Sequence, residues 1–189
     1  MTDNTLPPIE CAVVVPWKLE EAFRRFVDDF SKWWPHGTHS IGAKRVHRIV
    51  FEAHAGGRIF EEHADGRRFQ WGCVSALERP HWVRFNFHPA RDPSTAQDVE
   101  IRFTAEGGGT RVVLTATGWE NWGRGASRAR KGYRLGWNYL LNEWAGRRTA
   151  GMLVIDALAL IARGVKVLRG GTAGAIRRAG GEIDGAEVP

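Results

Sequence analysis

Residues 97–118 read QDVEIRFTAEGGGTRVVLTATG, and this stretch decides the fold class. Apolar and polar residues alternate on both sides of the three glycines at 107–109, so each half predicts a β-strand with one apolar face. Glycine adopts the backbone angles of a tight reversal at low cost. The stretch therefore predicts an antiparallel hairpin with strands at 97–106 and 110–118.

The same alternation extends toward the N-terminus. Turn-forming residues, among them Gly56, Gly66 and Pro80, interrupt it where the chain must reverse. The runs between these turns predict strands at 44–54, 57–64, 68–78 and 81–89, and an earlier run predicts one at 9–15. Short connections favour antiparallel neighbours, so we expect a seven-stranded antiparallel sheet. Its concave face should carry Val83, Phe85, Phe87, Val99, Ile101, Phe103, Val112, Leu114 and Ala116.

Helical periodicity is found on both sides of the main strand series. Segment 19–30 repeats apolar residues every three or four positions, which predicts an amphipathic helix packed on the sheet. Segment 31–37, with Trp33 and Trp34, breaks this period and predicts a loop. The period returns at 126–148, with an apolar stripe of Tyr133, Trp137, Leu140, Leu141 and Trp144. The expected fold is α+β, with the sheet curved around this long C-terminal helix.

A further amphipathic helix is expected at 152–169, so we divide the chain into a domain at 1–150 and an appendage at 151–189. Its apolar residues, spaced by four and three, suit packing on the protein's own surface. The next alternative is a homodimer, because the same residues form a narrow seam that would pair with a second copy. Docking on an anionic membrane surface is the third alternative. The glycine-rich segment 170–189 is expected to be poorly ordered.

Composition limits where the protein works. Cys11 and Cys73 are too few for a disulfide framework, and the first residues show no secretory pattern, so we expect a cytoplasmic protein. The most apolar stretch, 152–162, is far shorter than the about 20 residues that cross a bilayer. We therefore expect no transmembrane segment.

The net charge of +6 is concentrated in residues 124–178, which carry 12 basic and two acidic side chains. No aromatic residues alternate with these basic ones in the manner of nucleic-acid-binding segments, so we expect no nucleic-acid partner. Most of the charge is interpreted as a solvated helix face. The alternative is a surface that docks an acidic protein or serves a co-chaperone-like role, formed by Arg128, Arg130, Arg134, Arg147 and Arg148.

Several short motifs, in this order and spacing, resemble the SRPBCC, or START-like, superfamily. Within it, the chain is most similar to the branch named for the activator of the ninety-kilodalton heat-shock-protein ATPase. The resemblance covers about residues 9–148. The motifs are Val13-Val14-Val15-Pro16, Ala22-Phe23, Trp33-Trp34, Gly56-Gly57-Arg58, Asp65-Gly66, Gly72-x-Val74, Arg79-Pro80, Gly109-Thr110-Arg111-Val112 and Gly136-Trp137-x-x-Leu140.

The resemblance implies a helix-grip fold with two short helices between the first two strands. Members bind lipids, hormones, polyketides or other apolar molecules, and some catalyse cyclisation or dehydration. The co-chaperone activity of the named branch depends partly on an additional N-terminal domain, for which we expect no room in 189 residues.

We therefore expect a cofactor-independent cavity for a mostly apolar small molecule between the sheet and helix 126–148. The nine tryptophans suit its walls, although plain core packing is an alternative use for each ring. Binding is favoured over catalysis. The predicted cavity residues are Trp33, Trp34, Trp71, Phe85, Phe87, Phe103, Leu114, Trp119, Tyr133, Trp137, Leu140 and Leu141.

Glu61 and His63 carry the alternative of a cyclase, dehydratase or hydrolase in the same cavity. Alternation places both on one face of their strand, where a buried carboxylate would suit acid or base work. An outward-facing charged strand is the favoured interpretation. No metal is expected, because neither the cysteines nor the carboxylates fall at familiar zinc spacing and His47 and His54 lie on opposite faces of a strand. No nucleophilic-serine or phosphate-binding motif is present.

Overall fold

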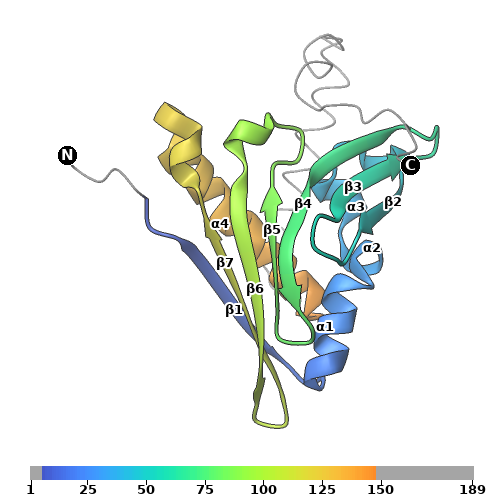
Figure 1. The fold of residues 1–189 in the computed structure, drawn as a ribbon, viewed down its shortest axis with the longest axis vertical. Helices are drawn as coiled ribbons and strands as arrows, with labels where there is room; N and C mark the ends of the chain where they lie inside the picture. Colours follow the sequence, from blue (N-terminus) through green and yellow to red (C-terminus); the bar gives the residue numbers. More distant parts are fainter. Residues whose placement is uncertain (1–5, 148–189) are drawn as a thin grey trace.

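A computed structural model describes residues 6–147 of the chain. Within this range, seven antiparallel strands form one curved sheet in the order β1-β7-β6-β5-β4-β3-β2, and a long helix lies across its inner side (Figure 1). The predicted helix-grip architecture is confirmed. The strands are β1 (Ile9–Val15), β2 (Val46–Phe51), β3 (Arg58–His63), β4 (Arg68–Glu78), β5 (Trp82–Phe87), β6 (Gln97–Glu106) and β7 (Gly109–Thr117).

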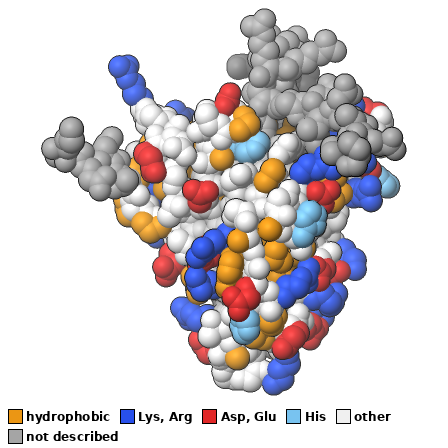
Figure 2. Space-filling view, in the orientation of Figure 1, with side chains coloured by type: hydrophobic (Ala, Val, Ile, Leu, Met, Phe, Trp, Pro, Cys, Tyr) orange, Lys and Arg blue, Asp and Glu red, His pale blue; other side chains and the backbone are white. Residues whose placement is uncertain are grey.

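The register of the central strands follows from the apolar alternation. In the β6–β7 hairpin, Phe103 lies opposite Val112 and Ile101 opposite Leu114. Residues opposite one another on paired strands share a face, and all nine residues predicted for the concave face are buried. Figure 2 shows the face of the sheet that is turned away from the long helix, where acidic and basic side chains are interspersed. There, Glu100 forms ion pairs with both Arg84 and Arg102.

The segment between β1 and β2 is more helical than the sequence predicts. Helix α1 (Leu19–Val27) is followed by two single-turn helices, α2 (Phe30–Trp33) and α3 (His36–His39), and by the 3-10 turn η1 (Ala43–Arg45). The loop predicted at 31–37 is therefore wrong, and β2 begins two residues later than predicted because η1 precedes it. The reason is tertiary: each tryptophan indole N–H bonds a backbone carbonyl, Trp33 to Phe26 and Trp34 to His39, at 2.9 and 3.0 Å.

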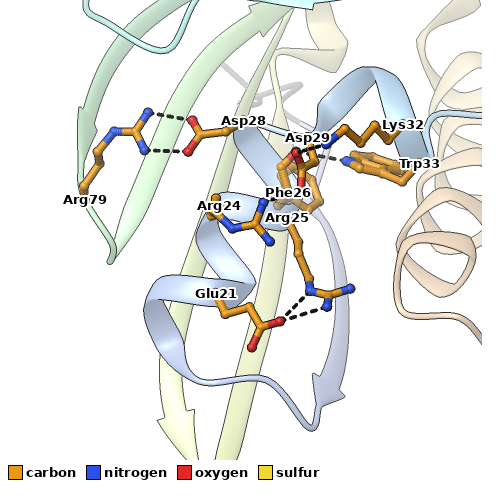
Figure 3. A network of polar contacts seen from close by, with 9 residues as sticks. All are labelled: Glu21, Arg24, Arg25, Phe26, Asp28, Asp29, Lys32, Trp33 and Arg79. Atoms are coloured by element: carbon orange, nitrogen blue, oxygen red, sulfur yellow. Dashed lines mark hydrogen bonds and ion pairs between the residues drawn. The ribbon is translucent and has the colours of Figure 1, made fainter.

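Polar contacts fix the junction between α1 and α2 (Figure 3). Asp29 accepts a hydrogen bond from Lys32 at 2.8 Å and a second from Arg24, and these contacts hold the pKa of its carboxyl below the ordinary value. Asp28, one residue earlier, accepts hydrogen bonds of 2.7 and 3.0 Å from the two terminal guanidinium nitrogens of Arg79, which lies in the turn after β4. The junction is thereby tied to the sheet, which places Trp33 and Trp34 over the core.

The long helix α4 (Ala126–Trp144) follows the 3-10 segment η3 (Trp119–Gly125). Its C-terminal half is gripped by the sheet: Trp137, Tyr139, Leu140, Leu141 and Trp144 are all buried, whereas no residue of 126–136 is buried. The predicted helix at 152–169 and the appendage 151–189 lie outside the described residues. Within residues 6–147, no helix has the length and apolar character needed to span a bilayer.

Phe26 of α1 joins the helices to the sheet. Its ring lies 5.0 Å from that of Trp33, 5.2 Å from that of Trp144 and 5.9 Å from that of Phe103 on β6. Three layers of structure therefore meet at one side chain. Because the interior is close-packed around it, truncation would leave a cavity that the neighbouring rings fill only in part.

We predict that Phe26→Ala lowers the free energy of unfolding by about 3–5 kcal/mol, the usual loss for a buried phenylalanine. Urea denaturation followed by tryptophan fluorescence measures this loss. The control is Leu135→Ala on α4, where the side chain is 63% exposed and the change should stay within about 0.5 kcal/mol. Similar losses for the two variants would show that Phe26 does not hold the layers together.

Candidate ligand-binding cavity

A cavity of about 660 Å³ lies along the N-terminal half of α4, which the sheet does not grip. It is bordered by the end of β5 with the loop that follows, by η3, and by α2 and α3 with their connection, and it is open to solvent. Drug-sized ligands occupy clefts of about 300–1,000 Å³, so the volume suits a small molecule of several rings. The lining residues are Trp34, His39, Phe87, Pro89, Arg91, Trp122, Gly125, Arg128, Ala129, Gly132, Tyr133, Gly136, Trp137 and Leu140.

Small residues on one face of α4 create this space. Gly125, Ala129, Gly132 and Gly136 follow one another at steps of four, three and four, which places them on a single helix face toward the cavity. A Cβ atom added at Gly132 or Gly136 would have no neighbour within 4 Å. Packing therefore does not require glycine at either position, although each glycine inside a helix costs about 1 kcal/mol relative to alanine. The missing side chains keep the cavity open.

Aromatic rings form the inner wall. The rings of Phe87 and Trp137 lie 5.0 Å apart, and Trp34 lies 6.1 Å from Phe87. The indole of Trp34 is fixed by its hydrogen bond to the carbonyl oxygen of His39, whose own ring stacks on Tyr139 of α4 at 4.6 Å. This wall is held in place by the protein itself, and it offers flat apolar faces to a guest.

Tyr133, Trp122 and Arg91 form the opposite, more polar end. The rings of Trp122 and Tyr133 are 5.7 Å apart, and the guanidinium carbon of Arg91 lies 4.1 Å from the centre of the Trp122 ring. Burial raises the pKa of Tyr133, against the lowering influence of Arg91 and Gln97, so its hydroxyl remains a hydrogen-bond donor at neutral pH. Within the described residues, the buried indole N–H groups of Trp122 and Trp137 have no hydrogen-bond partner.

Five of the twelve predicted cavity residues line this space: Trp34, Phe87, Tyr133, Trp137 and Leu140. The other seven do not line it. The interior is filled where the sheet grips α4, and the two sheet residues Phe85 and Phe103 pack there against Phe51 and Phe23, with ring distances of 5.6 and 5.2 Å. The residues outside the lining are Trp33, Trp71, Phe85, Phe103, Leu114, Trp119 and Leu141.

The sequence interpretation missed the small-residue face of α4 and the polar end of the cavity. Gly125, Ala129, Gly132 and Gly136 carry a readable signal, because their spacing matches that of an apolar stripe but supplies no apolar volume. Arg91 lies in the loop after β5 and Trp122 in the short 3-10 segment η3, and the sequence pattern predicts no orientation for either side chain. Gln97 was also missed, although it stands two positions before Val99 and so shares the concave face.

Glu61 and His63 are both buried, so the favoured outward-facing orientation is wrong. The Glu61 carboxylate accepts hydrogen bonds from the backbone N–H groups of Ile41, at 2.8 Å, and Gly42, at 2.7 Å, and it contacts Nε2 of His63 at 2.5 Å. A Cβ at Gly42 would stand 2.2 Å from that nitrogen, so the loop lies directly on the imidazole. Neither residue lines the cavity. Their contacts connect β3 to the loop between α3 and η1.

Two of the arginines predicted to dock an acidic protein already form hydrogen bonds within this protein. Arg130 donates to the carbonyl oxygens of Pro7 and Pro8 at 2.6 and 3.0 Å, and Arg147 donates to that of Val14, so both hold the chain of β1 and the residues before it against α4. Arg128 lines the cavity, and Arg134 is exposed. Arg148 lies outside the described residues.

No metal centre is visible between residues 6 and 147: no group of three or more His, Cys, Asp or Glu side chains converges there in a way that could hold an ion.

An antiparallel sheet curved around a long C-terminal helix, with space between the two, defines a helix-grip protein of the START-like superfamily. The family model described as Activator of Hsp90 ATPase homolog 1-like protein matches residues 18–145. The chain belongs to this family. No curated protein matches the chain.

Solved structures share the fold at low sequence identity. The protein MLL2253 from Mesorhizobium loti is 17% identical with a TM-score of 0.52, over 74% of this chain and 94% of that one. The Aha1 dimer from Colwellia psychrerythraea is 14% identical with a TM-score of 0.50, over 74% and 97%. The anthrahydroquino-γ-pyrone synthase Txn09, solved as a complex, is 26% identical with a TM-score of 0.52, over 75% and 97%.

We predict that Glu61→Gln destabilises the protein by about 2 kcal/mol or more. The Glu61 carboxylate now meets three hydrogen-bond donors, and in the variant the NH2 group of the amide would face one of them. Urea denaturation at pH 7 measures the loss. The matched control is Glu62→Gln on the same strand, whose carboxylate pairs with the exposed Arg48 and the half-buried Arg68 and whose loss should stay below about 1 kcal/mol. Equal losses would remove the connecting role assigned to Glu61.

Proposed function

We propose that this protein binds a mostly apolar, aromatic small molecule in the cavity beside the N-terminal half of α4, without a cofactor. The observation that carries the proposal is the face of α4 that presents Ala129, Gly132 and Gly136 to the cavity, opposite a wall of aromatic rings. A helix that only needed to pack would gain stability from alanine at Gly132 and Gly136. The family supports the same function, because START-like proteins commonly hold apolar ligands between sheet and helix.

The size and shape of the lining favour a planar, multi-ring guest. Trp34, Phe87 and Trp137 offer ring faces and edges to a ligand, and offset stacking on such rings contributes beyond simple area burial. The synthase Txn09 supports a polycyclic ligand class, since its name describes an anthrahydroquino-γ-pyrone product and its sequence is 26% identical.

Catalysis on such a molecule is the second candidate, and it rests on the same similarity to a synthase. General acid–base work needs a titratable group within hydrogen-bond reach of the substrate. Glu61 and His63 contact the loop and each other instead. Among the described lining residues, Tyr133 and His39 are the groups that could exchange a proton with a substrate, so turnover of a polycyclic substrate that persists in both Tyr133→Phe and His39→Gln would exclude this arrangement.

We predict that Gly136→Leu abolishes ligand binding while leaving the fold intact. The new side chain would enter open space from the centre of the cavity-facing helix face, and leucine is a better helix former than glycine. Titration with the neutral fluorophore 1-aminoanthracene should show saturable binding to the unsubstituted protein and at least a tenfold loss of affinity in the variant. The melting temperature should be equal or higher.

The control is Lys131→Leu, which introduces the same side chain on the exposed, opposite face of α4 and should change the affinity less than twofold. Identical binding curves for Gly136→Leu and the unsubstituted protein would show that the fluorophore binds elsewhere. An absence of saturable binding to all three proteins would count against the proposed function.

A further inference from the structure

Gln97, the first residue of β6, is a polar side chain buried in the apolar concave face. It is 0% exposed, and neither its amide nitrogen nor its amide oxygen forms a hydrogen bond of ordinary length within the described residues. A buried polar group left in this state costs about 1–3 kcal/mol. Such groups are rare in folded proteins and require an explanation. Leucine would fill the same volume without that cost, so packing alone does not account for the glutamine.

The position of Gln97 connects it with the cavity. It lies directly opposite Phe87 in the β5–β6 pairing, and residues opposite one another project from the same face of a sheet. Phe87 lines the cavity. Side-chain hydrogen bonding from Gln97 acts to lower the pKa of Tyr133, another lining residue, so the amide lies close to the phenol. The amide is therefore directed at Tyr133 from behind the cavity wall, and Gln97 does not itself line the cavity.

Arg91 completes this polar end. It lines the cavity, lies over the ring of Trp122 at 4.1 Å and acts on Tyr133 together with Gln97. Backbone hydrogen bonding from Arg91 N–H to the His88 carbonyl, at 2.9 Å, fixes the turn that carries it. Within the described residues, neither Arg91 nor the other lining arginine, Arg128, forms an ion pair with a carboxylate. The cavity thus contains positive charge and hydrogen-bond donors without an anion.

We propose that the cavity selects aromatic carboxylic acids: the carboxylate lies between Arg91 and the Tyr133 hydroxyl, and the rings lie against Trp34, Phe87 and Trp137. Gln97, behind this wall, positions the Tyr133 hydroxyl. This inference rests on the proposed function and adds its ligand class. Guanidinium groups bind carboxylates through two parallel hydrogen bonds, and such charge-assisted bonds are roughly twice as strong as neutral ones. The Tyr133 phenol stays protonated at neutral pH, so it donates to the carboxylate rather than repelling it.

The decisive experiment compares 2-anthracenecarboxylic acid with 2-anthracenecarboxamide, which share ring system and shape but differ in charge. Fluorescence titrations at pH 7 give both affinities. For the unsubstituted protein, the acid should bind at least tenfold more tightly than the amide. In Arg91→Gln, the affinity for the acid should fall at least tenfold, and that for the amide should change less than twofold. Arg111→Gln, the same substitution on the β7 surface, should leave both affinities within twofold.

Gln97→Leu separates a ligand-directed role from a structural one. If the amide serves the ligand, the variant should melt about 2–4 °C higher, because a buried unsatisfied group is removed. It should also bind the acid several-fold more weakly. A lower melting temperature together with unchanged affinity would assign Gln97 to the fold and overturn its part in the site.

The outcomes distinguish this inference from the proposed function. Equal affinities for acid and amide that Arg91→Gln does not change would overturn the carboxylate site, whereas binding that Gly136→Leu still abolishes would keep the apolar cavity. Failure of both anthracene compounds to bind at any soluble concentration would overturn the inference and the proposed function together.

Discussion

The structure depends on the contact between the C-terminal half of α4 and the concave face of the sheet. Trp144 packs against Phe26 and Trp17, with ring distances of 5.2 Å each, and Trp137 reaches Phe87 at the end of β5. Arg130 and Arg147 hold the same helix to the backbone of β1 and the residues before it. Arg130 lies in the N-terminal half of α4, but the buried side chains of the helix are all in its C-terminal half, so the N-terminal half does not have to fill the space beneath it. A firmly packed core and an open cavity are therefore produced by a single helix.

Each half of α4 carries a residue composition that suits its task. The gripped half presents large rings and leucines, whereas the cavity half presents Gly132 and Gly136 at positions where a methyl group would meet nothing. The cavity half gives up helix propensity at two positions, and the buried ring contacts of the gripped half offset that loss. The buried amide of Gln97 is a second local cost at the same place. Functional sites are where departures from optimal packing are expected.

The sequence predicts the architecture well, because alternation along strands and the helical stripe of α4 both report burial directly. It predicts the cavity less well. Phe85, Phe87 and Phe103 share one face in the sequence, yet only Phe87 lies where α4 presents small residues, and that depends on the helix crossing the sheet at an angle (Figure 1). The orientation of Glu61 is hidden for another reason: the loop at Ile41 and Gly42, distant in sequence, covers it and supplies its hydrogen bonds.

The contacts of Glu61 keep its carboxylate away from the cavity. Glu61 is the buried carboxylate that a cyclase-like reaction would recruit as a base, but two backbone N–H groups and His63 already meet its oxygens. Proton abstraction there would require the loop between α3 and η1 to come away from β3. The titratable groups that line the cavity are Arg91 and Arg128, which are cationic, Tyr133, whose phenol is held protonated, and His39, whose ring stacks on Tyr139. The two guanidinium groups and the phenol are suited to hold and orient an anion.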